Sequence, residues 1–382
     1  NNIGSLAGYV AFLEGHIVPL LLNSQLDFEL IEYLLKTYEP NYLWVPTKNK
    51  TKFSGNCIYE KFGYSLIEYS DKKKKIHDKL ALLLTTSGST GSPKLVRQSY
   101  DNIEANAASI AEYLELDETE RPITMLPMNY TYGLSVINSH LLVGATILMT
   151  DASYTQRDFW DFFKKQEATS IVGVPYTYEV LKKLRIFRME LPSLRYMTQA
   201  GGKLLPELHK EFAEYAQNNG KRFYVMYGQT EATARMSYLP YKESLRKYGS
   251  MGIAIPGGKF HLIDVDGTNV TSPYVTGELV YEGPNVTLGY AECLEDLAKG
   301  DERNGVLVTG DMAQFDEDGY YYIVGRKKRF LKIYGNRVNL DECERMIQGK
   351  FQGVECACTG VDDHMILYVT TSENHDEMKR FF

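Results

Sequence analysis

Cysteine and long apolar runs are scarce in this chain of 382 residues. Its five cysteines are odd in number, and Cys356 and Cys358 are one residue apart, which matches neither a zinc knuckle nor a redox pair. We therefore expect free thiols in a reducing compartment. The longest apolar stretches, such as residues 141–149, are too short to cross a bilayer, and no basic-then-apolar leader opens the sequence. These features predict a cytoplasmic protein without a membrane span.

Positive charge is also in deficit. The chain has 42 lysines and arginines against 49 acidic residues, giving a net charge of −7. This balance argues against a general binder of nucleic-acid backbones. The 44% hydrophobic and 24% charged residues are typical of a globular protein, and the length suffices for more than one domain.

Helical and strand patterns alternate over the first 235 residues. The spacing predicts an amphipathic helix over 23–38 behind an Asn/Ser cap, followed by a strand at 42–46. It also predicts a strand at 121–127, and a helix leading into a strand over 135–149. Such alternation indicates an α/β fold of mostly parallel sheets covered by helices, with ligands at the carboxyl ends of strands.

The pattern changes after about residue 235. Short alternating segments with Asp-Gly turns predict antiparallel β structure up to residue 326. A further α/β pattern begins with a helix expected over 339–351. We therefore predict a large domain over 1–326, whose β-rich part is 236–326, and the start of a small α+β domain over 327–382.

The segment SGSTGSPK (87–94) is rich in glycine and hydroxyl groups and ends in a lysine. It is not a Walker A loop, because its spacing differs and no Ser or Thr follows the lysine. Its chemistry nevertheless suits a phosphate cradle, since glycines permit close backbone approach, hydroxyls donate hydrogen bonds and an ammonium neutralises charge. A plain flexible turn is the alternative.

With its preceding threonine, this segment resembles the signature loop of the AMP-forming adenylating enzymes, which include acyl-CoA synthetases, peptide-synthetase adenylation domains and luciferases. The resemblance is closest to carboxylate-CoA ligases and covers nearly the whole chain. The other matching segments, in the family's order, are LPMNYTYGL (126–134), GVP (173–175), TQAGGKL (198–204), YGQTEAT (227–233), GELVYEGPNVTLGY (277–290), TGDMAQFDEDGYYYIVGR (309–326) and KKRFLKIYGNRVNLDECE (327–344).

The resemblance implies a two-step ligase reaction. A carboxylate would attack the α-phosphate of ATP, giving an acyl-adenylate and pyrophosphate, and the thiol of coenzyme A would then displace AMP. Such a catalyst mainly orients two anions and stabilises charge on phosphorus oxygens. A carrier-protein phosphopantetheine is the alternative acceptor. A non-catalytic nucleotide-binding protein with a ligase fold is the alternative of another class.

The resemblance also implies roles for the nucleotide-binding residues. Thr230 would donate to the α-phosphate, and Glu231 would hold Mg²⁺, a hard cation suited to one carboxylate plus phosphate oxygens. Asp311 would accept from the ribose hydroxyls and Arg326 would add a donor. The residues implied at the β- and γ-phosphates are Thr86, Ser87, Gly88, Ser89, Thr90, Gly91 and Lys94. Those implied around adenine and in the central motif are Gln199, Ala200, Gly201, Gly202, Tyr227, Gly228 and Gln229.

Three of these residues have simpler alternatives. Glu231 could be a surface carboxylate or a helix cap, and Asp311 a turn residue. Tyr227 could be a core residue, because 29 tyrosines are spread through the chain.

The resemblance further implies a moving small domain. Lys328 occupies the family's hinge position, and Lys332 and Gly335 would face the active site in the thioester-forming pose, with Gly335 on the thiol path. An exposed basic turn is the simpler description of this segment. The family also has a C-terminal Gly-Lys pair used in adenylation, and we assign no lysine here to that role. Adenylation would be strongly impaired in a chain without that lysine.

Two departures from the family bear on the substrate. Tyr130 stands where many members have a histidine, so an aromatic wall remains without a titratable imidazole. Gly133 stands where amino-acid-activating members have an aspartate, so a plain carboxylic acid is favoured over an amino acid. The tyrosines suggest a modest, aromatic-tolerant pocket. The predicted pocket residues are Tyr130, Tyr132, Gly133, Val174, Pro175, Tyr176, Met197, Thr198 and Met236.

Overall fold

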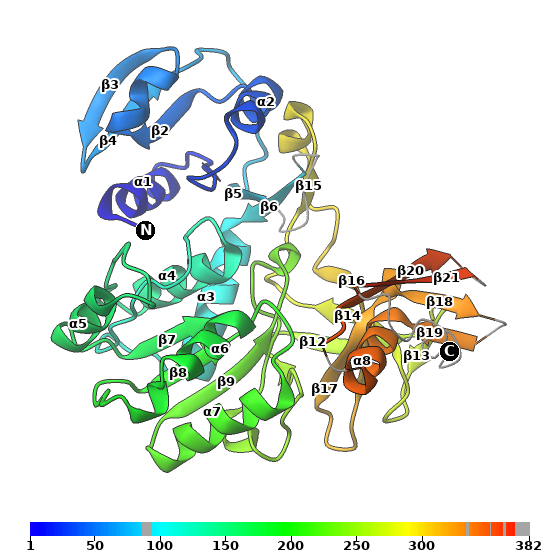
Figure 1. Ribbon diagram of the computed structural model, residues 1–382. Coiled ribbons are helices and arrows are strands. Elements are labelled where there is room, and N and C mark those ends of the chain that lie inside the picture. The colour runs from blue at the N-terminus through cyan, green and yellow to red at the C-terminus, as the bar shows by residue number, and fades with distance from the viewer. Residues whose placement is uncertain (86–93, 334–335, 352, 362–363, 371–382) are drawn as a thin grey trace. The chain divides into compact units, whose positions relative to one another are not determined.

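The computed structural model describes residues 1–85, 94–333, 336–351, 353–361 and 364–370 (Figure 1). The chain divides into two compact units, each treated separately below: Asn1–Phe260 with Tyr281–Leu307, and His261–Val280 with Val308–Phe382. The helices are α1 (Ile3–Glu14), α2 (Phe28–Tyr38), α3 (Tyr100–Leu114), α4 (Thr131–Leu142), α5 (Arg157–Lys165), α6 (Pro175–Lys183), α7 (Pro206–Asn218) and α8 (Leu340–Lys350).

Three sheets belong to the first unit. One has the order β1-β5-β6-β15, the second β11-β10-β9-β8-β7, and the third β2-β4-β3. Their strands are β1 (Leu20–Leu21), β2 (Tyr42–Pro46), β3 (Asn56–Lys61), β4 (Tyr64–Glu68), β5 (Leu80–Thr85), β6 (Leu95–Ser99), β7 (Ser170–Gly173), β8 (Tyr196–Gln199), β9 (Arg222–Tyr227), β10 (Ser237–Tyr238), β11 (Ile253–Ala254) and β15 (Gly289–Ala291).

The α/β fold class predicted from the alternating pattern is confirmed. Strands β7, β8 and β9 pair in parallel, and helices α6 and α7 connect them in sequence, as βαβ units require. All residues of β7 and β8 are buried, as expected for parallel strands covered on both faces. The sheet that holds β5 and β6 is mixed, because β5 pairs in parallel with β1 but antiparallel with β6.

Two local expectations were wrong. The helix predicted over 23–38 begins only at Phe28 and is capped by Asp27. The Asn23 side chain accepts from the Gln25 amide and holds a separate turn before it. The strands predicted at 121–127 and near 148 are single bridges, Pro122 to Ser170 and Ile123 to Leu148. Pro122 has no amide hydrogen to extend the ladder.

The second unit is mainly antiparallel, as predicted, with the sheet order β13-β12-β14-β16-β17 and two hairpins, β18-β19 and β20-β21. Helix α8 packs Leu340 and Cys343 against Leu331 and Cys358. The predicted domain boundary near residue 326 stays a prediction. The strands are β12 (Lys259–Ile263), β13 (Asn269–Val270), β14 (Gly277–Glu282), β16 (Val306–Phe315), β17 (Tyr321–Arg326), β18 (Phe330–Ile333), β19 (Asn336–Asn339), β20 (Cys356–Val361) and β21 (His364–Val369).

All five cysteines are free, as expected. Among the described helices, none combines the length and the apolar character that a bilayer crossing needs.

Arg97 on β6 joins distant parts of the first unit. Its side chain is fully buried, and its guanidinium donates to the carbonyls of Leu288, Tyr290 and Gly300 as well as to the Glu302 carboxylate. A planar group with five N–H donors can serve several acceptors at once, whereas an ammonium cannot match that geometry. Arg97 therefore fixes the 288–302 segment against β6.

Arg97→Lys is expected to lower the free energy of unfolding by about 2–4 kcal/mol, because it leaves buried carbonyls without donors while keeping the charge. Urea unfolding would measure this loss. Arg157→Lys is the matched control, because Arg157 is 90% exposed and its pair with Asp161 should contribute little. Equal stability of the two variants would contradict the role given to Arg97.

Candidate active site

The predicted phosphate loop connects two neighbouring antiparallel strands. Thr85 at the end of β5 pairs with Leu95 at the start of β6. Buried apolar residues anchor both strands in the core, so the end of β5 and the start of β6 lie at the same end of the sheet. The predicted loop residues 86–91 lie outside the described residues. Lys94, which follows them, is described: its Nζ lies 3.8 Å from the Tyr290 ring centroid and 3.4 Å from Glu292 Oε1.

A strained turn carries Thr230 and Glu231. It follows β9 and contains the short 3₁₀ segment Thr230–Ala232. After it, Thr233 and Ala234 adopt φ values of 57° and 120°, a region that costs about 1–3 kcal/mol per non-glycine residue. Gly228 is required, because a Cβ there would meet the Ala234 carbonyl oxygen.

Asn285 holds this turn in place. Its Nδ2 donates to the carbonyls of Ala232 at 2.8 Å and Arg235 at 3.1 Å, and its own carbonyl accepts from Thr233 Oγ1 at 2.7 Å. These three bonds hold the chain at and on either side of Thr233 and Ala234, the two residues with positive φ. Asn285 therefore offsets the strain and fixes where Glu231 points.

Tyr290 and Arg303 position Glu231 itself. The Tyr290 hydroxyl donates to Glu231 Oε1 at 2.7 Å. Arg303 Nη1 donates to the Glu231 carbonyl at 2.9 Å and to Thr287 Oγ1 at 2.6 Å, and its guanidinium lies 4.6 Å from the Tyr290 ring centroid. Burial and, to a smaller extent, the nearby Glu231 carboxylate raise the pKa of Tyr290 to about 12. This tyrosine therefore remains a donor near neutral pH.

The Tyr290 ring thus connects Lys94, Arg303 and Glu231. The predicted phosphate lysine and the predicted metal ligand belong to one cluster, as the resemblance implies. The sequence did not single out Tyr290 or Arg303. Tyr290 closes the matching segment 277–290, which was a usable signal, whereas Arg303 lies outside every matching segment.

If Glu231 binds Mg²⁺ as the resemblance implies, Tyr290→Phe is expected to reduce Mg²⁺-dependent turnover about tenfold or more and to raise the Mg²⁺ concentration required, because a hydrogen bond to a charged carboxylate is lost while the ring contacts remain. Magnesium titrations of pyrophosphate exchange would test this. Tyr100→Phe, which removes only a hydroxyl bonded to the Leu13 carbonyl, is the control. An unchanged magnesium dependence in Tyr290→Phe would show that the hydroxyl does not position Glu231.

Several predicted acyl-pocket residues meet at the carboxyl end of β8. The Tyr132 hydroxyl donates to the Thr198 carbonyl at 2.9 Å, and the rings of Tyr130 and Tyr132 lie 6.3 Å apart. Gly201 has a φ of 81°, and a Cβ there would lie 2.5 Å from the Tyr130 hydroxyl and 3.1 Å from Val174. Tyr130, Tyr132, Thr198, Val174 and Gly201 are therefore linked by a chain of close contacts.

The other predicted pocket and adenine residues are placed less uniformly. Pro175 begins α6, and a Cβ added at Gly202 would lie 3.1 Å from the Pro175 ring. Tyr176 is exposed. Met197 and Met236 are fully buried.

Gln199, predicted near adenine, is also buried. Its Nε2 donates to the carbonyls of Ala200 and Gly202, whereas its Oε1 accepts from no described residue. This unpaired acceptor at the Gly-rich strand end suits a ligand that offers an amino group. The Gln229 amide donates to the Tyr227 hydroxyl at 3.2 Å.

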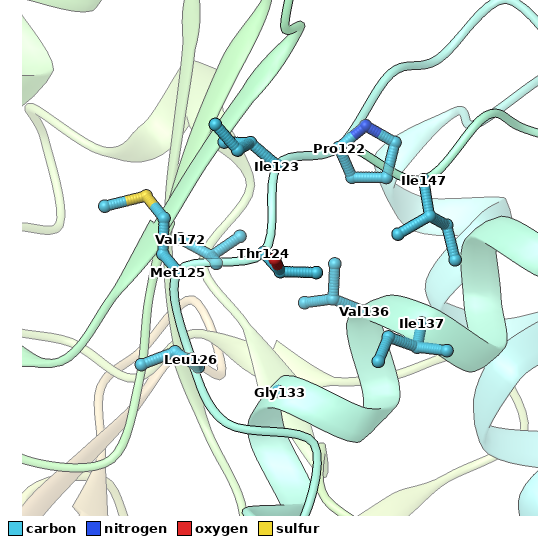
Figure 2. A pocket seen from close by; sticks show the side chains of 10 residues that line it. All are labelled: Pro122, Ile123, Thr124, Met125, Leu126, Gly133, Val136, Ile137, Ile147 and Val172. Carbon is cyan, nitrogen blue, oxygen red and sulfur yellow. The ribbon is translucent and has the colours of Figure 1, made fainter. Parts of the chain in front are cut away.

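A small apolar cavity of about 10 Å³ adjoins Gly133 on α4 (Figure 2). Val136 and Ile137 of that helix face the 122–126 segment across it, and Val172 on β7 lies beside Met125 of that segment. The space is about enough for one water molecule. Gly133 is therefore surrounded by apolar side chains, and a Cβ there would meet the Pro127 carbonyl oxygen.

In the second unit, the predicted ribose residues form a cross-strand pair. Asp311 on β16 lies opposite Arg326 on β17, and Arg326 Nε is 2.7 Å from Asp311 Oδ1. The Asp311 side chain is 4% exposed, while that of Arg326 is 66% exposed. A carboxylate has two oxygens and can accept from two neighbouring hydroxyls.

The predicted hinge lies between two anchored residues. Lys327 Nζ pairs with Glu278 at 2.6 Å, and Arg329 pairs with Asp341 at 2.7 Å, whereas Lys328 between them is exposed. Lys332 lies on β18 opposite Arg337, and its side chain lies outside the described part. Gly335 also lies outside the described residues.

The sequence of this chain matches the family model described as AMP-binding enzyme over residues 3–291. The chain belongs to the AMP-binding enzyme family. It is 31% identical to a 2-succinylbenzoate–CoA ligase of Geobacillus sp. (strain WCH70), and the matched stretch covers 75% of this chain and 56% of the ligase. It is 30% identical to an oxalate–CoA ligase of Arabidopsis thaliana, and the matched stretch covers 70% of this chain and 52% of that ligase. The chain thus spans about half the length of these curated relatives.

The fold of this AMP-binding chain matches solved structures. The O-succinylbenzoate coenzyme A synthetase (MenE) of Bacillus subtilis in complex with AMP superposes with a TM-score of 0.76 at 22% identity, covering all of this chain and 79% of that one. The same synthetase in complex with ATP and magnesium ion gives a TM-score of 0.73 at 23% identity. At this identity the likeness establishes the α/β architecture.

Proposed function

We propose that the protein activates a carboxylic acid with ATP and then transfers the acyl group to the thiol of coenzyme A. In the first step a carboxylate oxygen bonds to the α-phosphorus, and the bond from that phosphorus to the bridging oxygen breaks, releasing pyrophosphate. In the second step the thiol sulfur attacks the acyl carbon, the bond to AMP breaks, and the thiol proton is lost to solvent. AMP leaves readily, which is why activation precedes transfer.

The single observation that carries this proposal is the cluster of Glu231, Tyr290 and Lys94 at the end of the strands that bracket the phosphate loop. It places a carboxylate and an ammonium within reach of one phenol ring, in a chain of the AMP-binding family. Separate groups for a metal and for phosphate oxygens are what phosphoryl chemistry needs.

The donor set fits Mg²⁺. No group of three or more histidine, cysteine or acidic side chains in the described part could enclose a metal ion. A single carboxylate, Glu231, suits Mg²⁺, which keeps several waters and takes other oxygens from substrate phosphates. When bound, Mg²⁺ would neutralise charge on those phosphates. Tyr290 would hold the Glu231 carboxylate through its hydrogen bond, and Thr230 would donate its hydroxyl to the α-phosphate.

The remaining predicted residues take these proposed roles. The phosphate loop, including Thr86, Ser87 and Thr90, would bind the β- and γ-phosphates together with Lys94. Asp311 and Arg326 would bind the ribose, and Lys328 would be the hinge, supported by the anchors of its two neighbours. Lys332 and Gly335 would serve the thioester-forming pose. The small domain would begin at residue 327.

The acceptor and the setting are also proposals. The names of the relatives, both CoA ligases, favour coenzyme A over the phosphopantetheine of a carrier protein. We place the reaction in the cytoplasm.

Carboxylate-dependent exchange of labelled pyrophosphate into ATP tests the first step. The assay would include Mg²⁺ and a panel of aliphatic, aromatic, hydroxy and amino acids. Exchange with one class is expected and would identify it, and thioester formation with coenzyme A would follow. A protein of full natural length that binds ATP without any exchange would be non-catalytic.

A further inference from the structure

Arg235 carries a charge inside the first unit that no described acid balances. The residue is 2% exposed. Its Nε donates to Ser135 Oγ at 3.1 Å and its Nη1 to the Tyr113 hydroxyl at 2.9 Å, and its guanidinium lies 5.2 Å from the Tyr132 ring centroid. In the described part of the chain, no carboxylate pairs with it. A buried cation surrounded only by neutral groups is costly to maintain.

The guanidinium also has donors to spare. It offers five N–H groups, and the described partners accept only from Nε and Nη1, including a long contact of Nη1 with Met226 Sδ. No described oxygen accepts from Nη2. The buried carboxylate of Glu120 is bonded to Arg195 and to Thr169. An arginine left in this state is suited to a charged acceptor such as a carboxylate.

The position of this side chain connects it with the acyl site. It stacks against Tyr132, whose hydroxyl is bonded to Thr198 at the end of β8. The Tyr130 ring lies next to that of Tyr132 and reaches Gly201. In sequence, Arg235 lies four residues after Glu231, at the end of the same strained turn. The unpaired cation is therefore one aromatic ring away from the residues predicted to enclose the acyl group.

We infer that the acid activated by this protein carries a second anionic group, a carboxylate, which binds Arg235. This inference rests on the proposed function. It assigns Arg235 as a specificity-determining residue: the reacting carboxylate would approach the α-phosphate, and the second one would neutralise the buried guanidinium. The same charge repels an ammonium group, so amino acids are disfavoured both by Arg235 and by the apolar surroundings of Gly133.

The test compares acids that differ only in the second charge. The pairs are pentanoate with glutarate, hexanoate with adipate, and benzoate with phthalate, and the monomethyl esters of the diacids serve as neutral controls of similar shape. Pyrophosphate exchange gives kcat/KM for each. At least one diacid is expected to exceed its monoacid and its monoester about 10- to 100-fold. This comparison needs no substitution.

Arg235→Met then tests the residue. It should remove the preference for the diacid while exchange with the monoacid persists. Arg222→Met is the matched control, because Arg222 is also largely buried but is paired with Glu115, and the preference should survive there. Exchange that favours monoacids, or a diacid preference retained in Arg235→Met, would overturn the inference and leave the proposed function standing. An absence of exchange with every acid would overturn both.

Discussion

Glu231→Gln is expected to reduce Mg²⁺-dependent pyrophosphate exchange by about 10²–10³-fold, the size of effect seen when one preorganised electrostatic group is removed. The substitution keeps the shape of the side chain and an oxygen that can accept from Tyr290, so the turn held by Asn285 should persist. What is lost is the negative charge that Mg²⁺ requires. The loss should therefore appear in turnover and in the magnesium dependence.

Glu214→Gln provides the control for this prediction. Glu214 lies on α7, is about half exposed and is 3.9 Å from Lys210, so its removal should change neither exchange nor the melting temperature. Thermal unfolding of Glu231→Gln should match that of the unsubstituted protein. If both glutamine variants exchanged pyrophosphate equally well, Glu231 would not be the metal ligand.

Asp311→Asn is expected to raise the KM for ATP by about 10- to 100-fold. A carboxylate that accepts from two ribose hydroxyls makes two charge-assisted hydrogen bonds, each contributing about 1.5–3 kcal/mol, and the amide retains only part of this. Arg326 loses its partner, but it is 66% exposed and solvent replaces the pair. The effect should therefore fall on nucleotide affinity rather than on folding.

Deoxynucleotides separate a ribose contact from a general loss of affinity. The unsubstituted protein should discriminate against 2′-deoxy-ATP and 3′-deoxy-ATP. Asp311→Asn should bind ATP and these two analogues with similar, weaker affinity, because the group that reads the hydroxyls has changed. Full discrimination in the variant would contradict the assignment of Asp311.

The sequence predicted those parts of the fold and site that depend on local pattern. Alternation of helices and strands predicted the α/β class, and buried runs such as residues 80–85 formed strands. The YGQTEAT segment identified the turn that carries Glu231. Errors were local too: a side-chain bond at Asn23 delayed a helix, and Pro122 reduced a strand to a bridge. In both places, one atom decided an outcome that the surrounding pattern could not predict.

The parts that sequence did not predict depend on pairing between distant residues. Arg97 and Arg303 look like ordinary surface cations in the sequence, and only the fold reveals their partners. For Arg235, the informative fact is that no carboxylate of the described residues pairs with it, which no linear spacing reports. Residues of this kind are recognised by what surrounds them.

The wide sequence separation within the Glu231 cluster has a consequence for the order in which the protein is made. Glu231 is bonded to Thr287, Tyr290 and Arg303, which lie 56, 59 and 72 residues later in the chain. On the ribosome, the turn therefore emerges well before the residues that hold it, and contacts of such separation form late. A nascent chain can complete its β7–β9 sheet while the Glu231 carboxylate, proposed here to bind Mg²⁺, still lacks a fixed orientation. The orientation of Glu231 is thus fixed late in biosynthesis.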